Sequence, residues 1–284
     1  MANPPLWKAS VALIKAHAAD AAAALELEGS AQAVLIVEEP FADEAVVEAL
    51  YSEEPDAGYL TRIAGRQISV APLPDQDWIR LSQEGLPPVR AGRFFVYGAH
   101  DAGTVPHGVI PIKIEAGLAF GTGHHETTAL CLSLLSRLAR AREFRNVLDL
   151  GCGTGLLAIG AAKLWKKPVL ASDIDPVAVE VAQGNARANG VAPLVRAIRA
   201  DGLVHPVLAQ AAPFDLLIAN ILASPLTRLA PAIMRSLAPE AILLLSGLLA
   251  NQEALVASFY RELRFVSCRR MGRWSAMMFE KPQS

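Results

Sequence analysis

The sequence VLDLGCGTG, at residues 147–155, combines a short apolar segment, an acidic residue and three closely spaced glycines. The apolar part, Val147–Leu150, predicts a buried strand, and the apolar residues from 156 onward predict a helix. Glycines between a strand and a helix allow a tight turn and a close approach of the backbone to a ligand. The sequence therefore predicts a ligand-binding turn in a doubly wound α/β sheet.

The composition of this turn favours a cationic ligand over a dinucleotide. In the nicotinamide fingerprint the third glycine follows the first by five positions, where this chain has Leu156, and its own third glycine is Gly155. An acidic residue directly before the turn suits a positively charged ligand better than a pyrophosphate. S-adenosylmethionine, which carries a sulfonium and an ammonium group, fits this pattern. Its candidate contacts here are Asp149, Gly151 and Gly153.

The second predicted strand also ends in an acidic residue. Asp173 follows the apolar segment Val169–Ser172 and lies 22 residues after Gly151. A carboxylate near this spacing accepts hydrogen bonds from ribose hydroxyl groups in nucleotide-binding sheets. Asp175, which precedes Pro176, is instead typical of a helix N-cap. We therefore expect Asp173 to contact the cofactor and Asp175 to cap the next helix.

Asn220 follows the fourth predicted strand, Asp215–Ala219. In a doubly wound sheet, ligands bind at the carboxyl edge, beside the first strand. A side-chain amide at that edge can accept a hydrogen bond from an amine and orient its lone pair. The alternative is a loop asparagine that only satisfies backbone groups. Asn220 is the candidate catalytic residue and a further candidate cofactor contact.

The C-terminal part of the chain alternates apolar strands with helices, which predicts a mostly parallel sheet covered on both faces. An antiparallel hairpin around Gly272 is expected to close it. The predicted strands are 93–97, 109–115, 147–150, 169–172, 194–199, 215–219, 241–245, 265–269 and 274–279, and the predicted helices are 127–139, 156–164, 176–188, 226–237 and 252–262.

The N-terminal part predicts a separate small domain. Its elements follow the order β-α-β-β-α-β, which suits a ferredoxin-like α+β sandwich. The predicted elements are 7–13, 16–27, 33–37, 45–51, 59–64 and 67–72. A proline-rich polar segment follows it. We expect a first domain over residues 1–74, a linker over 75–92 and a catalytic domain over 93–284.

The near-neutral net charge of −2 conceals an asymmetry between these parts. Residues 1–74 contain four Lys/Arg and eleven Asp/Glu, a net charge of −7, and the other 210 residues contain 22 and 17, a net charge of +5. An acidic domain would repel nucleic-acid phosphates and attract a basic protein. A solvated acidic face without a partner is the alternative. We expect no direct nucleic-acid binding.

The sequence contains no signal-peptide core, because Lys8 and Lys15 interrupt the apolar N-terminus. Its longest apolar segment, 241–250, is far shorter than the roughly 20 residues of a membrane helix. The cysteines Cys131, Cys152 and Cys268 form no CxxC pair and are typical of a reducing compartment. We expect a cytoplasmic protein without a membrane segment and without a bound metal.

Three further segments narrow the interpretation: EAGLAFGTGHHETT at 115–128, NILA at 220–223 and LSGLL at 245–249. Together with the glycine turn, they resemble the ribosomal protein L11 methyltransferase family (PrmA type), within the class I S-adenosylmethionine-dependent methyltransferases. The resemblance is dense over about residues 110–250. It implies a Rossmann-like seven-stranded sheet, preceded by a small substrate-recognition domain.

The resemblance also implies the reaction. A large-subunit ribosomal protein would be methylated on lysine side chains and on the N-terminal amine, with S-adenosylhomocysteine as the product. By position, the family's cofactor contacts fall on Thr128, Gly151, Asp173 and Asn220. We expect the enzyme to act as a monomer.

The residues around the site favour an aliphatic amine as the nucleophile. Ile221 and Leu222 follow Asn220, whereas methyltransferases that act on planar nitrogens have Asn-Pro-Pro-Tyr. The candidate proton acceptors are His124, His125 and Glu126. The family usually has threonine and proline where this chain has His124 and Glu126, so the turn and the titrating role of these side chains stay open.

Three other functions remain possible at this stage. The same fold could methylate another protein, an RNA or a small molecule. The chain could also be a module that binds S-adenosylmethionine without turnover, although intact candidate residues argue against this. A nicotinamide-dependent dehydrogenase is the least favoured interpretation because of Leu156.

Overall fold

The structure of the protein is a computed structural model that describes residues 7–27, 31, 33–38, 43–51, 53–72, 88–98, 103–114 and 126–283. The chain divides into two compact units, Met1–Trp78 and Ile79–Ser284. None of the helices among the described residues is long and apolar enough to cross a lipid bilayer.

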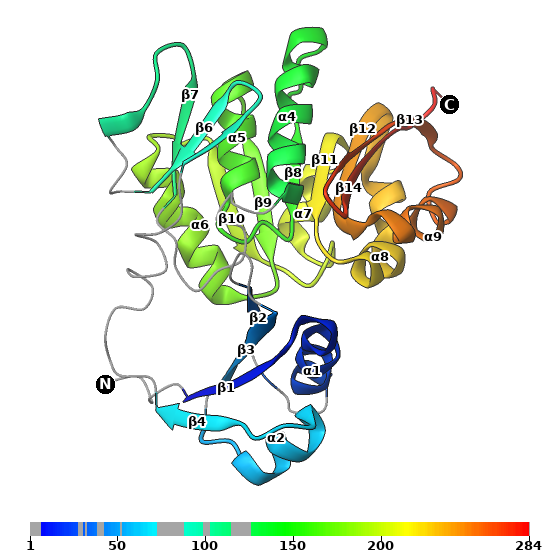
Figure 1. Ribbon diagram of the computed structural model, residues 1–284. Coiled ribbons are helices and arrows are strands. Elements are labelled where there is room, and N and C mark those ends of the chain that lie inside the picture. The colour runs from blue at the N-terminus through cyan, green and yellow to red at the C-terminus, as the bar shows by residue number, and fades with distance from the viewer. Residues whose placement is uncertain are drawn as a thin grey trace. The chain divides into compact units, whose positions relative to one another are not determined.

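The N-terminal unit is a four-stranded antiparallel sheet with the strand order β2-β3-β1-β4 (Figure 1). Alternate residues of β1, Ala9, Val11 and Leu13, are buried against the helices, as expected for a sheet with one covered face. The β-α-β-β-α-β order agrees with the predicted ferredoxin-like sandwich. The elements are β1 (Trp7–Ile14), α1 (Lys15–Leu27), β2 (Ala33–Glu38), β3 (Glu44–Tyr51), α2 (Ala57–Ala64) and β4 (Ser69–Pro72).

A small three-stranded sheet begins the C-terminal unit. In it β5 (Val89–Ala91) pairs antiparallel with β6 (Phe94–Tyr97), and β6 pairs parallel with β7 (Ile110–Lys113). β5 lies in the segment 75–92 for which we expected a linker, and residues 75–87 of that segment lie outside the described residues. The Arg93 N–H donates to Ser136 Oγ at 3.0 Å, which attaches this small sheet to α4.

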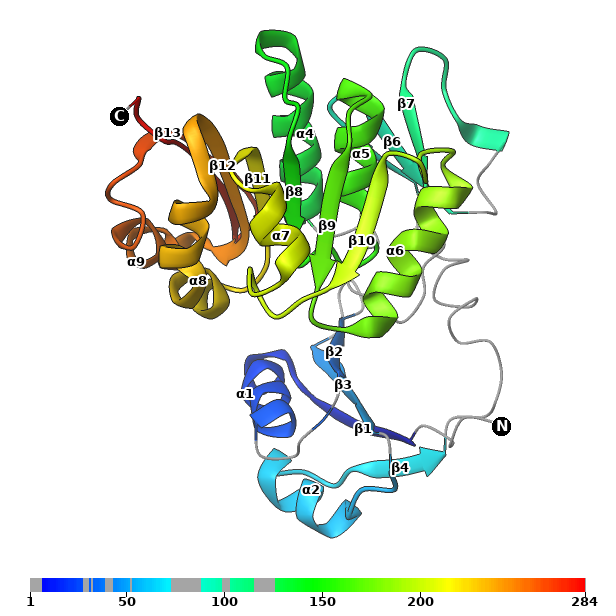
Figure 2. The same cartoon turned by 180° about the vertical axis from the view of Figure 1, so that it is seen from behind.

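The large sheet has seven strands in the order β10-β9-β8-β11-β12-β14-β13 (Figures 1 and 2). β8 to β12 are parallel to one another, and β14 runs antiparallel to both β12 and β13. This confirms the predicted parallel sheet and its closing hairpin. The strands are β8 (Val147–Leu150), β9 (Val169–Asp173), β10 (Val195–Arg199), β11 (Phe214–Asn220), β12 (Leu237–Leu249), β13 (Arg264–Met271) and β14 (Trp274–Glu280).

Two apolar cores lie on opposite faces of this sheet. Alternate strand residues supply them: Leu216 and Ile218 face one core, and Leu217 and Ala219 face the other. One core is covered by α4 (Glu126–Ala141), α5 (Leu156–Trp165) and α6 (Pro176–Ala188), and the other by α7 (Pro206–Ala211), α8 (Ala223–Ser236) and α9 (Glu253–Ser258). A 3-10 turn, η2 (Ala250–Gln252), precedes α9.

Some predicted element bounds were wrong. α7 was not predicted, and α9 is shorter than the predicted helix over 252–262. The predicted helix over 226–237 begins three residues earlier and ends at Ser236. β12 starts at Leu237 and continues through Gly247, whereas the prediction covered only 241–245.

Candidate active site

The turn after β8 is built from three glycines in the left-handed region. The φ angles of Gly151, Gly153 and Gly155 are +71°, +52° and +75°. The N–H groups of Gly151 and Cys152 both donate to the carbonyl oxygen of Ser172 in β9, at 2.8 and 3.0 Å. The turn is therefore fixed to the neighbouring strand.

Two of these glycines also leave no room for a side chain. A Cβ on Gly151 would lie 2.3 Å from Ile221 Cγ2, and one on Gly155 would lie 2.9 Å from the Cβ of Ala182 in α6. Glycine is thus required both by conformation and by packing. The predicted glycine turn between a strand and a helix is present, and it packs against the residue that follows Asn220.

Asp149 lies beneath this turn rather than at its surface. Its side chain is 1% exposed, and its Oδ2 accepts the N–H of Ala158 near the start of α5 at 2.8 Å. Burial raises the pKa of Asp149 to about 7; the Ala158 hydrogen bond lowers it, and the nearby Asp173 charge raises it further. In the structure Asp149 therefore anchors α5 to β8.

Asp173 ties the glycine turn to the end of β9. Its Oδ2 accepts the N–H of Gly153 at 2.9 Å, and its Oδ1 accepts the N–H of Asp175 at 3.1 Å. Asp175 Oδ1 in turn accepts the N–H of Val177 at 2.8 Å, which confirms it as the N-cap of α6. A carboxylate has about four lone-pair positions, so Asp173 retains acceptor capacity for a ligand.

Asn220 has one satisfied and one unsatisfied side-chain atom. Its Nδ2 donates to Thr128 Oγ1 at 3.4 Å, and Thr128 is buried in the first turn of α4. Its Oδ1 is buried and has no hydrogen-bond partner among the residues that the structure describes. Leaving such an acceptor unpaired costs about 1–3 kcal/mol. Asn220 Oδ1 is therefore an open acceptor for a donor that a ligand would bring.

Ile221 holds Asn220 in place from both sides. The side chain of Ile221 packs against Gly151, and the backbone of Ile221 packs against Gly247 of β12. A Cβ on Gly247 would lie 2.5 Å from the carbonyl oxygen of Ile221. Gly247 has a φ of +82°, which a residue with a side chain rarely adopts. The sequence analysis assigned no role to Gly247. In the sequence, the only signal that pointed to Gly247 was its place in the segment LSGLL.

The structure brings most of the predicted site residues to one edge. Asp149, Gly151 and Gly153 belong to β8 and the turn after it, and Asp173 and Asn220 end the strands on either side. Thr128 reaches this edge from α4. Of the candidate proton acceptors, His124 and His125 lie outside the described residues, and Glu126 is the exposed first residue of α4.

The comparisons with known proteins identify the family. A family model described as ribosomal protein L11 methyltransferase (PrmA) matches residues 8–282 of the chain. The chain belongs to the PrmA family. This confirms the resemblance and, with it, the fold of an S-adenosylmethionine-dependent methyltransferase.

Individual relatives agree with this assignment. A ribosomal protein L11 methyltransferase of Mesorhizobium japonicum is 55% identical over 188 residues, which cover 66% of this chain and 65% of that protein. A ribosomal protein L11 methyltransferase of Rhizobium etli is 47% identical over 236 residues, which cover 82% of this chain and 78% of that protein. The solved structure of a ribosomal protein L11 methylase from Lactobacillus delbrueckii subsp. bulgaricus has a TM-score of 0.62 and 28% identity, covering 70% of this PrmA-family chain and 100% of that one.

Proposed function

We propose that the protein is an S-adenosylmethionine-dependent N-methyltransferase that modifies lysine side chains, and the N-terminal amine, of ribosomal protein L11. Membership of the PrmA family supports the substrate. The feature of the site that supports amine chemistry best is the buried Oδ1 of Asn220, which accepts no hydrogen bond from the described part of the chain. An amine brings the N–H donor that this atom lacks.

The residues at the carboxyl edge suit the cofactor. Left-handed glycines form the turn after β8, and the Asp173 carboxylate that accepts the Gly153 N–H retains acceptor capacity for the ribose hydroxyl groups of a ligand. We assign the cofactor contacts to Thr128, Asp149, Gly151, Gly153, Asp173 and Asn220. When bound, S-adenosylmethionine supplies an electrophilic methyl group on its sulfonium, and the sulfur leaves as the neutral thioether of S-adenosylhomocysteine.

Asn220 acts on the nucleophile. Its Oδ1 accepts one N–H of the neutral amine and so aims the nitrogen lone pair at the methyl carbon, where a C–N bond forms as the S–C bond breaks. Thr128 fixes the amide orientation by accepting from Nδ2. Holding two reactants at near-attack distance contributes up to about 7–11 kcal/mol to catalysis.

The amine must lose a proton before it reacts. The reference pKa of a lysine amine is about 10.4, and burial beside a positive charge lowers it. This makes a strong general base unnecessary, and Glu126 at the start of α4 is the described group that could accept the proton.

We further propose that the acidic first domain expected over residues 1–74, which lies within the N-terminal unit, holds the substrate protein. Its net charge of −7 complements a basic ribosomal protein, and complementary charge accelerates encounter more than it adds affinity.

Mass spectrometry tests the proposed function. Ribosomal protein L11 from cells without methyltransferase activity is incubated with the enzyme and S-adenosylmethionine. We expect mass increases in steps of one methyl group on lysine and N-terminal amines, and a much slower increase with Asn220→Ala. Binding of S-adenosylhomocysteine without methylation of L11, together with methylation of an unrelated substrate, would contradict the proposal.

A further inference from the structure

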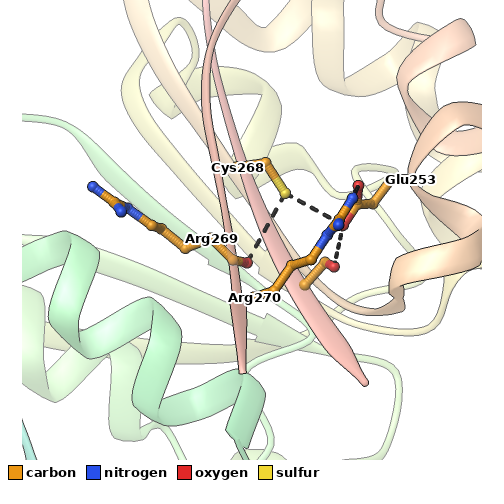
Figure 3. Close-up of polar contacts among 5 residues, drawn as sticks. Glu253, Cys268, Arg269 and Arg270 are labelled. Carbon is orange, nitrogen blue, oxygen red and sulfur yellow. Dashed lines mark hydrogen bonds and ion pairs between the residues drawn. The ribbon is translucent and has the colours of Figure 1, made fainter. Parts of the chain in front are cut away.

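A polar cluster around Glu253 connects the β13–β14 hairpin to the start of α9 (Figure 3). The carboxylate of Glu253, the first residue of α9, accepts two hydrogen bonds from Arg270, at 2.6 and 2.5 Å. It also accepts from the thiol of Cys268 at 3.4 Å and from the hydroxyl of Ser275. These donors lower the pKa of Glu253 to about 2, the Arg270 hydrogen bond contributing most.

The end of β12 is a β-bulge. Leu245 pairs with Met277 and Leu248 with Ser275, so two residues of β12, Ser246 and Gly247, face a single residue of β14. A bulge interrupts the ladder hydrogen bonds, and other groups must hold its residues.

Consecutive residues at the start of α9 support this bulge. Gln252 Oε1 accepts the N–H of Leu249 at 2.9 Å, after the bulge. Glu253 holds the side chain of Ser275, whose backbone oxygen accepts from Ser246 Oγ at 2.9 Å within the bulge. Both Ser246 and Ser275 are fully buried, so the hydrogen bond between them is shielded from water.

The bulge in turn touches the candidate catalytic residue. Ser246 lies opposite Asn220 in the parallel β11–β12 ladder, and Gly247 packs against the carbonyl of Ile221. A shift of the bulge would therefore move the backbone that carries Asn220. Misplacement by about 1 Å can cost 100-fold in rate.

We propose that Glu253 is a positioning residue for Asn220, acting through Ser275 and Ser246 on the β12 bulge. The catalytic consequence rests on the function proposed above. The geometric consequence, a defined place for the Asn220 amide, does not depend on the substrate.

The chain contains a matched control for this proposal. Arg264 and Glu280 form a second Arg–Glu pair at the opposite end of the same hairpin. The two pairs are similarly exposed, with 61% for Arg270 and 16% for Glu253 against 65% for Arg264 and 21% for Glu280. Glu280 also lies 3.7 Å from Arg142, but it is far from the bulge in the β14 register.

Steady-state kinetics on L11 form the first test. We expect Glu253→Ala and Ser275→Ala each to lower kcat about tenfold with little change in the KM for S-adenosylmethionine, because positioning and not binding is lost. The double variant should be no worse than either single one. Glu253→Gln, which can still accept from Ser275, should recover most of kcat, and Glu280→Ala should keep it.

The side-chain amide signal of Asn220 in a ¹⁵N-labelled sample, assigned by its loss in Asn220→Ala, gives a second readout. We expect it to move in Glu253→Ala and Ser275→Ala but not in Glu280→Ala. Ser275→Ala deletes a single oxygen, so it carries the test if Glu253→Ala does not fold. Equal effects of the Glu253 and Glu280 variants on kcat and on this signal would overturn the proposal. If the wild type leaves L11 unmodified, the proposed function fails, and the amide signal still decides the positioning role.

Discussion

The carbonyl oxygen of Ile221 occupies the space into which a side chain on Gly247 would extend, at 2.5 Å from an ideal Cβ. Gly151 contacts the same residue from the other side, through the Ile221 Cγ2 atom. One isoleucine therefore makes two glycines necessary, one in the turn after β8 and one in β12, the strands on either side of β11, and Asn220 directly precedes it at the end of β11.

Substitution of these glycines should separate the two contacts. Gly151→Ala and Gly247→Ala should each destabilise the fold by at least about 1–2 kcal/mol, the cost of a left-handed conformation, plus the steric overlap. In an Ile221→Ala background, Gly151→Ala should lower the free energy of unfolding by less, because the Cγ2 atom of Ile221 is absent. Gly247→Ala should cost the same, because it meets a backbone oxygen.

Urea denaturation of the two glycine variants, each with and without Ile221→Ala, and of the wild type and Ile221→Ala alone, measures these costs as double-mutant cycles. If Ile221→Ala reduced the destabilisation caused by both glycine variants to the same extent, the contacts of Ile221 would differ from those in the structure.

Asn220 variants should affect the chemical step more than cofactor binding. Asn220→Ala should lower kcat about 100-fold. It should change the Kd for S-adenosylhomocysteine by a smaller factor. Thr128→Val removes the acceptor for the Nδ2 of Asn220 but leaves its Oδ1, so this variant should lower kcat by a smaller factor. Stopped assays on L11 and calorimetric titration with S-adenosylhomocysteine give the two quantities.

Asn220→Asp should also change the pH dependence of the reaction. A carboxylate beside the amine stabilises its protonated form and raises its pKa. The pH at half-maximal kcat should therefore move upward relative to the wild type. An unchanged pH profile would show that residue 220 does not contact the amine.

Asp149 should make the stability of the fold depend on pH. Its pKa is raised to about 7 in the folded protein, against about 3.9 for an unfolded chain. Between these values the folded state holds a proton that the unfolded state has lost, so the free energy of unfolding falls as pH rises. The slope due to this group is at most about 1.4 kcal/mol per pH unit.

Urea denaturation between pH 4 and pH 8 tests this by comparison with Asp149→Asn, which cannot titrate. The wild type should lose stability relative to the variant up to about pH 7, and the two curves should run parallel above it. Parallel curves over the whole range would mean that Asp149 is ionised in the folded protein throughout.

The acidic N-terminal unit should make substrate encounter salt-dependent. Added NaCl should raise the KM for L11 but not the KM for S-adenosylmethionine, because screening acts on the charged protein partner. Replacing exposed Glu53 and Glu54 by glutamine should reduce this salt effect. The matched control, Glu143 and Glu262 to glutamine in the other unit, should leave it unchanged; a similar response of both pairs would contradict substrate holding by residues 1–74.

The sequence predicted the large sheet well because its signals are local. Apolar strands followed by glycine or acidic residues, as at Val147–Leu150 and Val169–Asp173, set both the strands and the edge at which they end. Asp175 before Pro176 likewise identified the N-cap of α6 from two residues. A short helix such as Pro206–Ala211 has too few residues to show a period, and it was missed.

A site residue could be predicted from the sequence only where its residue type and its local position were informative by themselves. Asn220 stood out as a polar side chain at a strand end, whereas the orphaned state of its Oδ1 depends on packing that no local pattern contains. Thr128 came only from the family resemblance. Contacts such as Ile221 with Gly247, or Glu253 with Ser275, join residues distant in sequence, and they required the three-dimensional structure.

The strand order places a late part of the chain in the interior of the large sheet. β14 lies between β12 and β13, and it supplies the Ser275 oxygen that Ser246 binds. During synthesis, residues up to Glu280 must therefore leave the ribosome before the edge that carries Asn220 is complete, although the N-terminal unit can fold much earlier. A nascent chain that already exposes its acidic unit would thus still lack the completed sheet edge at which the candidate site lies.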